Sequence, residues 1–145
     1  MAGRAGVSVA HVRGSARFAH SSVLVLDLID GASGFDTLKA DSDFTAVLRE
    51  AWRQISLLHD ARIAHRDLRL ANVIVGADGL VRIVDFGFAE ETASERRMAM
   101  DVAEFLTATA LQFGTDEAIG AAIVVIGPAA LASALPFIQP LALSA

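Results

Sequence analysis

Apolar residues open the chain in two short runs. Residues 7–12 alternate between apolar and polar positions, and residues 16–30 are mostly apolar. These periods are typical of strands, and Gly14 and Ser15 between the runs favour a hairpin-like turn. We therefore expect two strands joined by that turn, followed by a loop over residues 31–34.

Residues 42–59 repeat apolar side chains at the spacing of one helical face, which predicts an amphipathic helix. The residues on the expected apolar face are Phe44, Val47, Leu48, Ala51, Ile55 and Leu58. The residues on the expected polar face are Arg49, Glu50, Arg53 and Gln54. Side chains that suit the cap at the start of the helix are Asp41, Ser42 and Asp43.

A second hairpin is expected further along the chain. Residues 72–75 and 80–84 are short β-rich runs, and the Gly-Ala-Asp-Gly segment 76–79 between them suits a tight turn. Because such a hairpin folds the chain back on itself, it brings Asn72 and Asp85 to the same edge of the strands.

The last third of the chain predicts helices. Ser94 suits the start of one helix and Gly114 its end, and Thr115 suits the cap of the next helix. Gly127 followed by Pro128 should break that second helix. The expected buried face of the first helix consists of Met98, Val102, Phe105, Thr109 and Phe113.

The absence of charge after Glu117 has two interpretations. By length alone, the uncharged run could span a membrane. The turn-forming residues Gly127, Pro128, Pro136 and Pro140 favour instead two helices of the domain core. In the core interpretation the buried residues of the run include Ile119, Ile123, Val124 and Ile126.

Composition narrows the class of protein. The 145 residues carry a net charge of −5 and correspond in size to one domain. No basic stripe is present, so nucleic acid is not an expected partner. The chain has no cysteine, which excludes a disulfide framework and cysteine-based metal or nucleophile sites.

The densest chemical signal lies in residues 65–87. His65-Arg66-Asp67 is followed by Asn72 after five residues, and Asp85-Phe86-Gly87 begins thirteen residues beyond Asn72. Phosphoryl transfer needs a carboxylate at the attacking hydroxyl and oxygen ligands for Mg²⁺. This order and spacing resemble the catalytic loop of protein kinases, and the combination of the three motifs is specific.

The resemblance extends over roughly residues 20–106. It implies an α+β fold that is a partial protein-kinase-like fold, with a mostly helical C-lobe and a catalytic-loop hairpin. Residues 1–30 would be remnant N-lobe strands and the hinge, and residues 31–145 the C-lobe. No A-P-E follows Asp85-Phe86-Gly87, so the chain is most similar to the atypical bacterial branch that includes RIO and lipopolysaccharide kinases.

The resemblance also implies roles for individual residues. Asp67 would orient the acceptor hydroxyl, while Asn72 and Asp85 would hold Mg²⁺ and thereby the nucleotide. Arg69 would neutralise charge on the transferred group, with an exposed structural arginine as the alternative. The backbone from Asp27 to Ile29 would be the hinge that binds the adenine of ATP.

Three further positions have supporting roles in this interpretation. His65 and Arg66 are expected to act as scaffold, with Arg66 in an intramolecular salt bridge. Asp101 resembles the residue that anchors the catalytic loop from below, and a solvated helix aspartate is the alternative.

Parts of a kinase ATP site are missing from this sequence. No Gly-rich loop precedes the hinge, and Lys39, the only lysine, follows it. We therefore expect a fragment that is inactive alone: a truncated product, a late start or one piece of a split chain. The alternative is a non-catalytic pseudokinase or interaction module attached to a membrane protein.

The expected partners follow from these two interpretations. They are ATP, an unknown hydroxyl acceptor on protein, lipid or glycan, a chain that supplies the missing N-lobe, and a membrane. The expected location is the cytoplasm, with the inner face of the membrane as the alternative.

Overall fold

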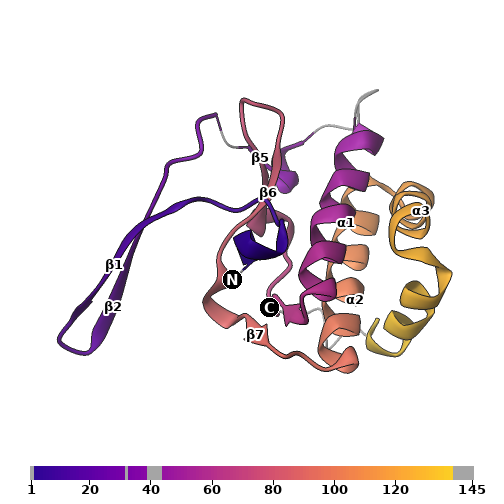
Figure 1. Ribbon diagram of the computed structural model, residues 1–145. Helices are drawn as coiled ribbons and strands as arrows, with labels where there is room; N and C mark the ends of the chain where they lie inside the picture. Colours follow the sequence, from indigo (N-terminus) through magenta and orange to yellow (C-terminus); the bar gives the residue numbers. More distant parts are fainter. Residues whose placement is uncertain (1, 32, 39–43, 139–145) are drawn as a thin grey trace.

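The longest elements of the fold are α-helices that pack around a common core: α1 (Phe44–Asp60), α2 (Glu95–Phe113) and α3 (Thr115–Ala134). The computed structural model describes residues 2–31, 33–38 and 44–138. Short strands lie beside the helices, so the fold is α+β, as the sequence predicts (Figure 1). Single 3-10 turns occur at Ala2–Ala5 (η1), Phe35–Thr37 (η2), Leu70–Asn72 (η3), Phe86–Phe88 (η4) and Leu135–Phe137 (η5).

The first hairpin differs from its prediction in register. Strands β1 (Val12–Phe18) and β2 (Ser21–Leu26) pair antiparallel, and the turn lies at Ala19 and His20 rather than at Gly14 and Ser15. Ala19 takes the left-handed backbone conformation that the turn requires, with φ of 53°. Gly14 lies inside β1, next to an irregularity in the pairing. The prediction was wrong because a glycine can mark a bulge as well as a turn.

Residues 7–11 do not form the predicted strand. Val7 is buried in the core instead. Both backbone polar groups of Ser8 form hydrogen bonds. Its N–H donates to Gln54 Oε1 at 2.6 Å, and its carbonyl accepts from Ile83 N at 3.1 Å. The alternation at 7–9 thus reflects packing of an irregular segment against α1 and the strand that contains Ile83.

The β1–β2 hairpin projects from the body of the molecule (Figure 1). Its apolar side chains are solvent-exposed, with Phe18 at 79% and Leu24 at 57%. Both faces of the hairpin therefore present apolar surface, which an isolated two-stranded ribbon cannot bury.

The remaining strands form two small sheets. In one, β5 (Val73–Val75) pairs antiparallel with β6 (Val81–Ile83) and with β3 (Ser33–Gly34). The turn at 76–79 is confirmed, with Gly79 at φ 75° and its N–H bonded to Gly76 O at 2.9 Å. In the other, β4 (Ile63–Ala64) pairs with β7 (Glu90–Glu91).

Helix α1 buries the predicted face apart from Val47, which is half-buried. Trp52 is buried as well and packs edge-on against Phe105 of α2, with ring centroids 5.0 Å apart. Gln54 was expected on the polar face, but it is buried and 2% exposed. It is buried because it accepts from the Ser8 amide and donates to Glu50 Oε1 at 2.6 Å. The proposed cap residues 41–43 and Lys39 lie outside the described residues.

Helix α2 begins as predicted, because Ser94 caps it by accepting from Arg97 N at 3.3 Å. Gly114, with φ of 99°, ends α2 and also precedes α3, so Gly114 rather than Thr115 is the cap residue of α3. The predicted break occurs at Gly127, whose φ of 77° interrupts the helix before Pro128.

Helix α3 packs against α1 and α2 through small side chains: Ala118, Ala121, Ala122 and Ala134 are buried. The expectation that Ile119, Ile123 and Val124 are buried was wrong, since they are 42%, 43% and 65% exposed. Alanines lie inward because the helices approach closely, which leaves the larger side chains outside. By length and composition alone, Thr115–Phe137 meets the criterion for a membrane span, with mean hydropathy 2.2.

Candidate active site

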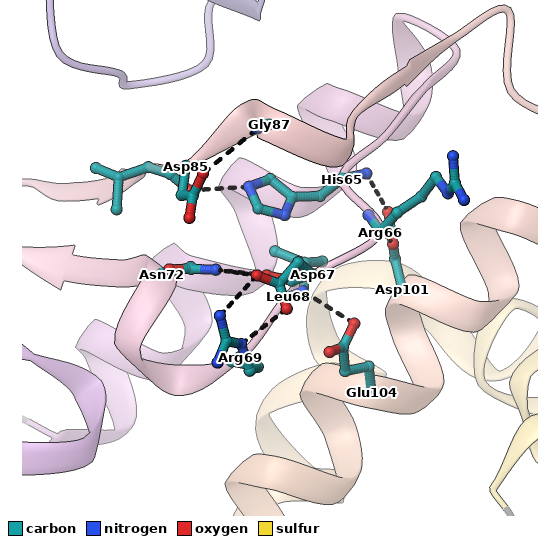
Figure 2. A network of polar contacts seen from close by, with 11 residues as sticks. His65, Arg66, Asp67, Leu68, Arg69, Asn72, Asp85, Gly87, Asp101 and Glu104 are labelled. Carbon is teal, nitrogen blue, oxygen red and sulfur yellow. Dashed lines mark hydrogen bonds and ion pairs between the residues drawn. The ribbon is translucent and has the colours of Figure 1, made fainter. Parts of the chain in front are cut away.

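Asp67 lies in the loop that leads from β4 to η3, and its carboxylate is fully engaged (Figure 2). Arg69 donates from Nε to Oδ1 at 2.7 Å and from Nη2 to Oδ2 at 2.9 Å. The hydrogen bonds from Arg69 hold the pKa of Asp67 below its ordinary value, and Asn72 adds to this effect. Asp67 is therefore an ionised carboxylate near neutral pH.

Asn72 connects the loop that contains Asp67 to the strands. Its Nδ2 donates to the Asp67 backbone carbonyl and to Asp67 Oδ2, both at 2.9 Å. The backbone carbonyl of Asn72 accepts from the N–H of Val84 at 2.9 Å, and Val84 directly precedes Asp85. The predicted hairpin thus brings Asp67, Asn72 and the Asp85 segment together (Figure 2).

Asp85 has an unusual backbone conformation. Its φ of 62° lies in the left-handed region, which is strained for a non-glycine residue. Its Oδ1 accepts from Gly87 N at 3.4 Å, and the residue is solvent-exposed. His65 supports this turn, since its Nε2 bonds to Val84 O at 2.9 Å and its ring packs against Phe86. The scaffold role expected for His65 agrees with these contacts.

Asp101 of α2 anchors the loop from beneath. It is 1% exposed and accepts the backbone N–H of His65 at 2.6 Å and of Arg66 at 2.8 Å. The His59 ring nitrogen lies 3.2 Å from the same carboxylate. A solvated helix aspartate is thereby excluded, and the anchoring role is supported.

Glu104 is a site residue that the sequence did not reveal. Its Oε2 accepts from the backbone N–H of Leu68 at 2.9 Å, one residue after Asp67. Burial raises the pKa of Glu104 above its ordinary value. The only sequence signal was its position three residues after Asp101 on the same helical face.

Arg66 points away from the Asp67 carboxylate (Figure 2). Its φ of 67° reverses the backbone between the two side chains. Its Nη1 lies 3.7 Å from Glu90 Oε2, and Arg97 Nε lies 3.4 Å from the same oxygen. The expected intramolecular salt bridge of Arg66 is present.

The residues expected to form the hinge lie apart from this cluster. Asp27 donates its backbone N–H to His11 O at 2.9 Å, and its carboxylate binds the side chain of Arg13. That hydrogen bond lowers the pKa of Asp27. Among the described residues, no hydrogen bond joins Asp27 or Ile29 to the catalytic loop. Both border an open cavity of about 580 Å³ lined by Val9, Ala10, His11, Asp27, Leu28, Ile29, Asp30, Ala77, Asp78 and Arg82.

Comparison with known families identifies the fold. Residues 7–110 match the protein kinase domain family, which is more than half of the chain. The chain therefore belongs to the protein kinase domain family, whose members generally use ATP and Mg²⁺.

Individual relatives agree with the family. The chain is 32% identical to serine/threonine-protein kinase pak-1 of Caenorhabditis elegans over 78 residues, 51% of this chain and 14% of the relative. It is 31% identical to serine/threonine-protein kinase PAK 1 of Mus musculus over 77 residues, 50% of this chain and 14% of the relative. The chain thus spans about a seventh of these relatives. They give no support to the atypical RIO and lipopolysaccharide-kinase branch expected from the sequence.

Proposed function

We propose that this domain transfers the γ-phosphoryl group of ATP to a hydroxyl acceptor. Asp67 orients the acceptor hydroxyl and takes its proton, and Arg69 neutralises charge on the transferred group. The observation that carries the proposal is the double hydrogen bond from Asn72 to Asp67, next to the turn that presents Asp85. It supports a single site in which base and metal ligands are neighbours.

The donor atoms around this site suit Mg²⁺. The amide nitrogen of Asn72 is used by Asp67, which leaves its Oδ1 without a hydrogen-bond donor among the described residues. Asp85 contributes an exposed carboxylate. Asn72 and Asp85 would hold the ion, and two oxygen ligands suit Mg²⁺ because it takes further ligands from water and phosphates. When bound, the ion would neutralise charge on the phosphates.

Arg69 has two states in this proposal. In the structure it forms a paired contact with Asp67, so the carboxylate that would accept the proton is occupied. An anionic phosphoryl group nearby would compete for the guanidinium, because both are favourable partners for arginine. Release of Arg69 would then free Asp67 for the acceptor.

The hinge and the N-lobe strands complete the proposed nucleotide site. Residues 27–29 would contact adenine through their backbone, and residues 1–30 would belong to an N-lobe. The β1–β2 hairpin exposes apolar faces, which is an argument for a further chain segment that covers them. That segment would supply the Gly-rich loop and the lysine.

The acceptor is proposed only as a hydroxyl. The relatives reported above are serine/threonine-protein kinases, which supports a protein hydroxyl as the acceptor. Only a short segment joins Gly87 to the start of α2 at Glu95, which supports a compact acceptor site. Because of this short segment, the proposal also includes a lipid or glycan hydroxyl as the acceptor, as in an atypical kinase.

The binding test uses the chain alone and then a completed domain. The 145-residue chain should bind Mg·ATP weakly and show no measurable transfer, since most of the phosphate cradle is missing from it. A protein that adds an N-lobe segment should transfer phosphate from radiolabelled ATP in a Mg²⁺-dependent way. Robust turnover by the chain alone would contradict the first expectation, and inactivity of every completed domain would contradict the function.

A non-catalytic role is the second candidate, and one observation favours it. The outer face of α3 and the β1–β2 hairpin both expose large apolar side chains, which is typical of docking surfaces. In that case the domain would bind a partner or a membrane at the cytoplasmic face. Retained folding without nucleotide binding in a completed domain would favour this role.

A further inference from the structure

Two carboxylates of α2 contact the catalytic loop on either side of Asp67 (Figure 2). Asp101 accepts the amides of His65 and Arg66, which precede Asp67. Glu104, one helical turn further along α2, accepts the amide of Leu68, which follows it. The peptides before and after the catalytic carboxylate are therefore tied to the same helix.

The position of Glu104 is electrostatically unfavourable. Burial raises the pKa of its carboxyl, and the neighbouring charges of Asp101 and Asp67 act in the same direction. The amide of Leu68 and the charge of Arg69 oppose that shift. A carboxylate kept in such surroundings is typical of a functional position, because a neutral side chain would fold there with less penalty.

We propose that Glu104 is a positioning residue, which fixes the peptide after Asp67 and so orients the Asp67 carboxylate toward Arg69 and Asn72. The side chain of Leu68 is fully buried, so this residue is held through both its side chain and its amide. With Leu68 held, the backbone of Asp67 has little freedom to rotate. The orienting effect is a property of the fold, and its catalytic meaning rests on the proposed phosphoryl transfer.

The test compares two substitutions of similar size in the full 145-residue chain, under conditions where it is monodisperse. Glu104→Gln keeps a hydrogen-bond acceptor, whereas Glu104→Met fills the space without one. Glu91→Gln, on the exposed strand β7, is the control. NMR measures hydrogen exchange of the Leu68 amide, together with the side-chain signals of Arg69 Nε–H and Asn72 Nδ2–H.

We expect Glu104→Gln and the control to leave Leu68 exchange within about threefold of the parent. Glu104→Met should speed it by roughly tenfold or more, because a hydrogen bond to a charged group is lost. The Arg69 and Asn72 signals should also shift or broaden in Glu104→Met and persist in Glu104→Gln. A residue that only filled space would leave those two signals unchanged, and that result would overturn the proposal.

Two further outcomes are decisive. If Glu104→Met does not fold, Glu104→Leu, which also lacks an acceptor, takes its place under the same criteria. Rapid Leu68 exchange in Glu104→Gln would overturn the positioning role independently. None of these measurements needs nucleotide or turnover. An inactive completed domain would therefore remove the catalytic meaning while leaving the measured orientation of Asp67 intact.

Discussion

Arg69 and Asp67 are joined by two parallel hydrogen bonds of 2.7 and 2.9 Å, so the carboxylate expected to act as base is already paired. Paired arginine–carboxylate contacts are stronger than single ones because both donors are fixed by one planar group. This pair joins residues two positions apart in the chain, whereas Asp101 and Glu104 of α2 hold the backbone on either side of Asp67.

Removing either central carboxylate should abolish transfer in a completed domain. We expect Asp67→Ala and Asp85→Ala each to lower the rate roughly a thousandfold or more, because they act on the acceptor and the metal. Asp60→Ala, at the exposed end of α1, is the matched control. The rate is measured with radiolabelled ATP, and helicity by circular dichroism. A near-parent rate in either variant with normal helicity would show that the roles are misassigned.

The Asp101 anchor should be a stability determinant. Asp101→Ala leaves the amides of His65 and Arg66 without their acceptor in a buried place, so we expect a loss of about 3 kcal/mol or more. Asp101→Asn keeps one acceptor oxygen and should lose less. Urea unfolding of both variants measures the difference. Equal, small effects would contradict the anchoring role.

Close packing of α3 predicts opposite sensitivities at two neighbouring positions. Ala122 is fully buried, so Ala122→Leu should destabilise the domain by about 1–3 kcal/mol through overpacking. Val124 is 65% exposed, so Val124→Ser should change stability by less than about 0.5 kcal/mol. The midpoints of urea unfolding measure the stability of both variants. A larger loss of stability from Val124→Ser than from Ala122→Leu would mean that α3 packs by its other face.

The exposed hairpin predicts self-association. We expect the isolated chain to associate with rising concentration, because both faces of the hairpin and its strand edges lack cover. Leu24→Lys combined with Val25→Lys charges both faces and should reduce association. Val124→Lys tests the outer face of α3 in the same way. Sedimentation velocity distinguishes them, and a compact, detergent-free monomer of the parent chain at all concentrations would refute the expectation.

Glu104 predicts a specific pH dependence of stability. Its pKa is raised in the folded state, chiefly by burial, with Asp101, Asp67 and Arg69 as the charged neighbours. The folded protein therefore holds this proton more tightly than the unfolded chain. Its contribution to stability is fully present below the ordinary glutamate pKa and is lost as pH rises through the folded pKa.

The variant Glu104→Gln isolates this contribution. Its unfolding free energy minus that of the parent should rise as pH increases from about 4 to 7, since other titrating groups cancel in the difference. Urea unfolding of both proteins at several pH values provides the measurement. A difference that stays constant, or falls, over this range would show that the pKa of Glu104 is not raised.

The sequence predicted that Asn72 and Asp85 lie together, and the structure places the Asp85 segment beside Asn72 and Asp67 because these residues are close along the chain. A tight turn at 76–79 fixes the spacing between Asn72 and Asp85, and local spacing is visible without a structure. The contact of Glu104 was not visible, because its partner is a backbone amide, and amides carry no side-chain signal. The face of α3 was misjudged because size suggests burial, whereas the separation between helices decides it.

Boundaries near the N-terminus failed for a related reason. Alternation at residues 7–9 is compatible with a strand. The segment instead forms single hydrogen bonds from Ser8 to Gln54 of α1 and to Ile83 of β6. Only the position of Gln54, which was placed on the polar face, distinguishes the two cases. A buried amide side chain that bonds a distant backbone cannot be inferred from periodicity.

The break at Gly127 divides α3 into two short parts. The part of α3 before it rises about 18 Å and the part from Pro128 to Ala134 about 10 Å, whereas a hydrocarbon layer is about 30 Å thick. Figure 1 shows the two parts running in different directions. In this conformation neither part alone spans a bilayer, because each is shorter than the hydrocarbon layer.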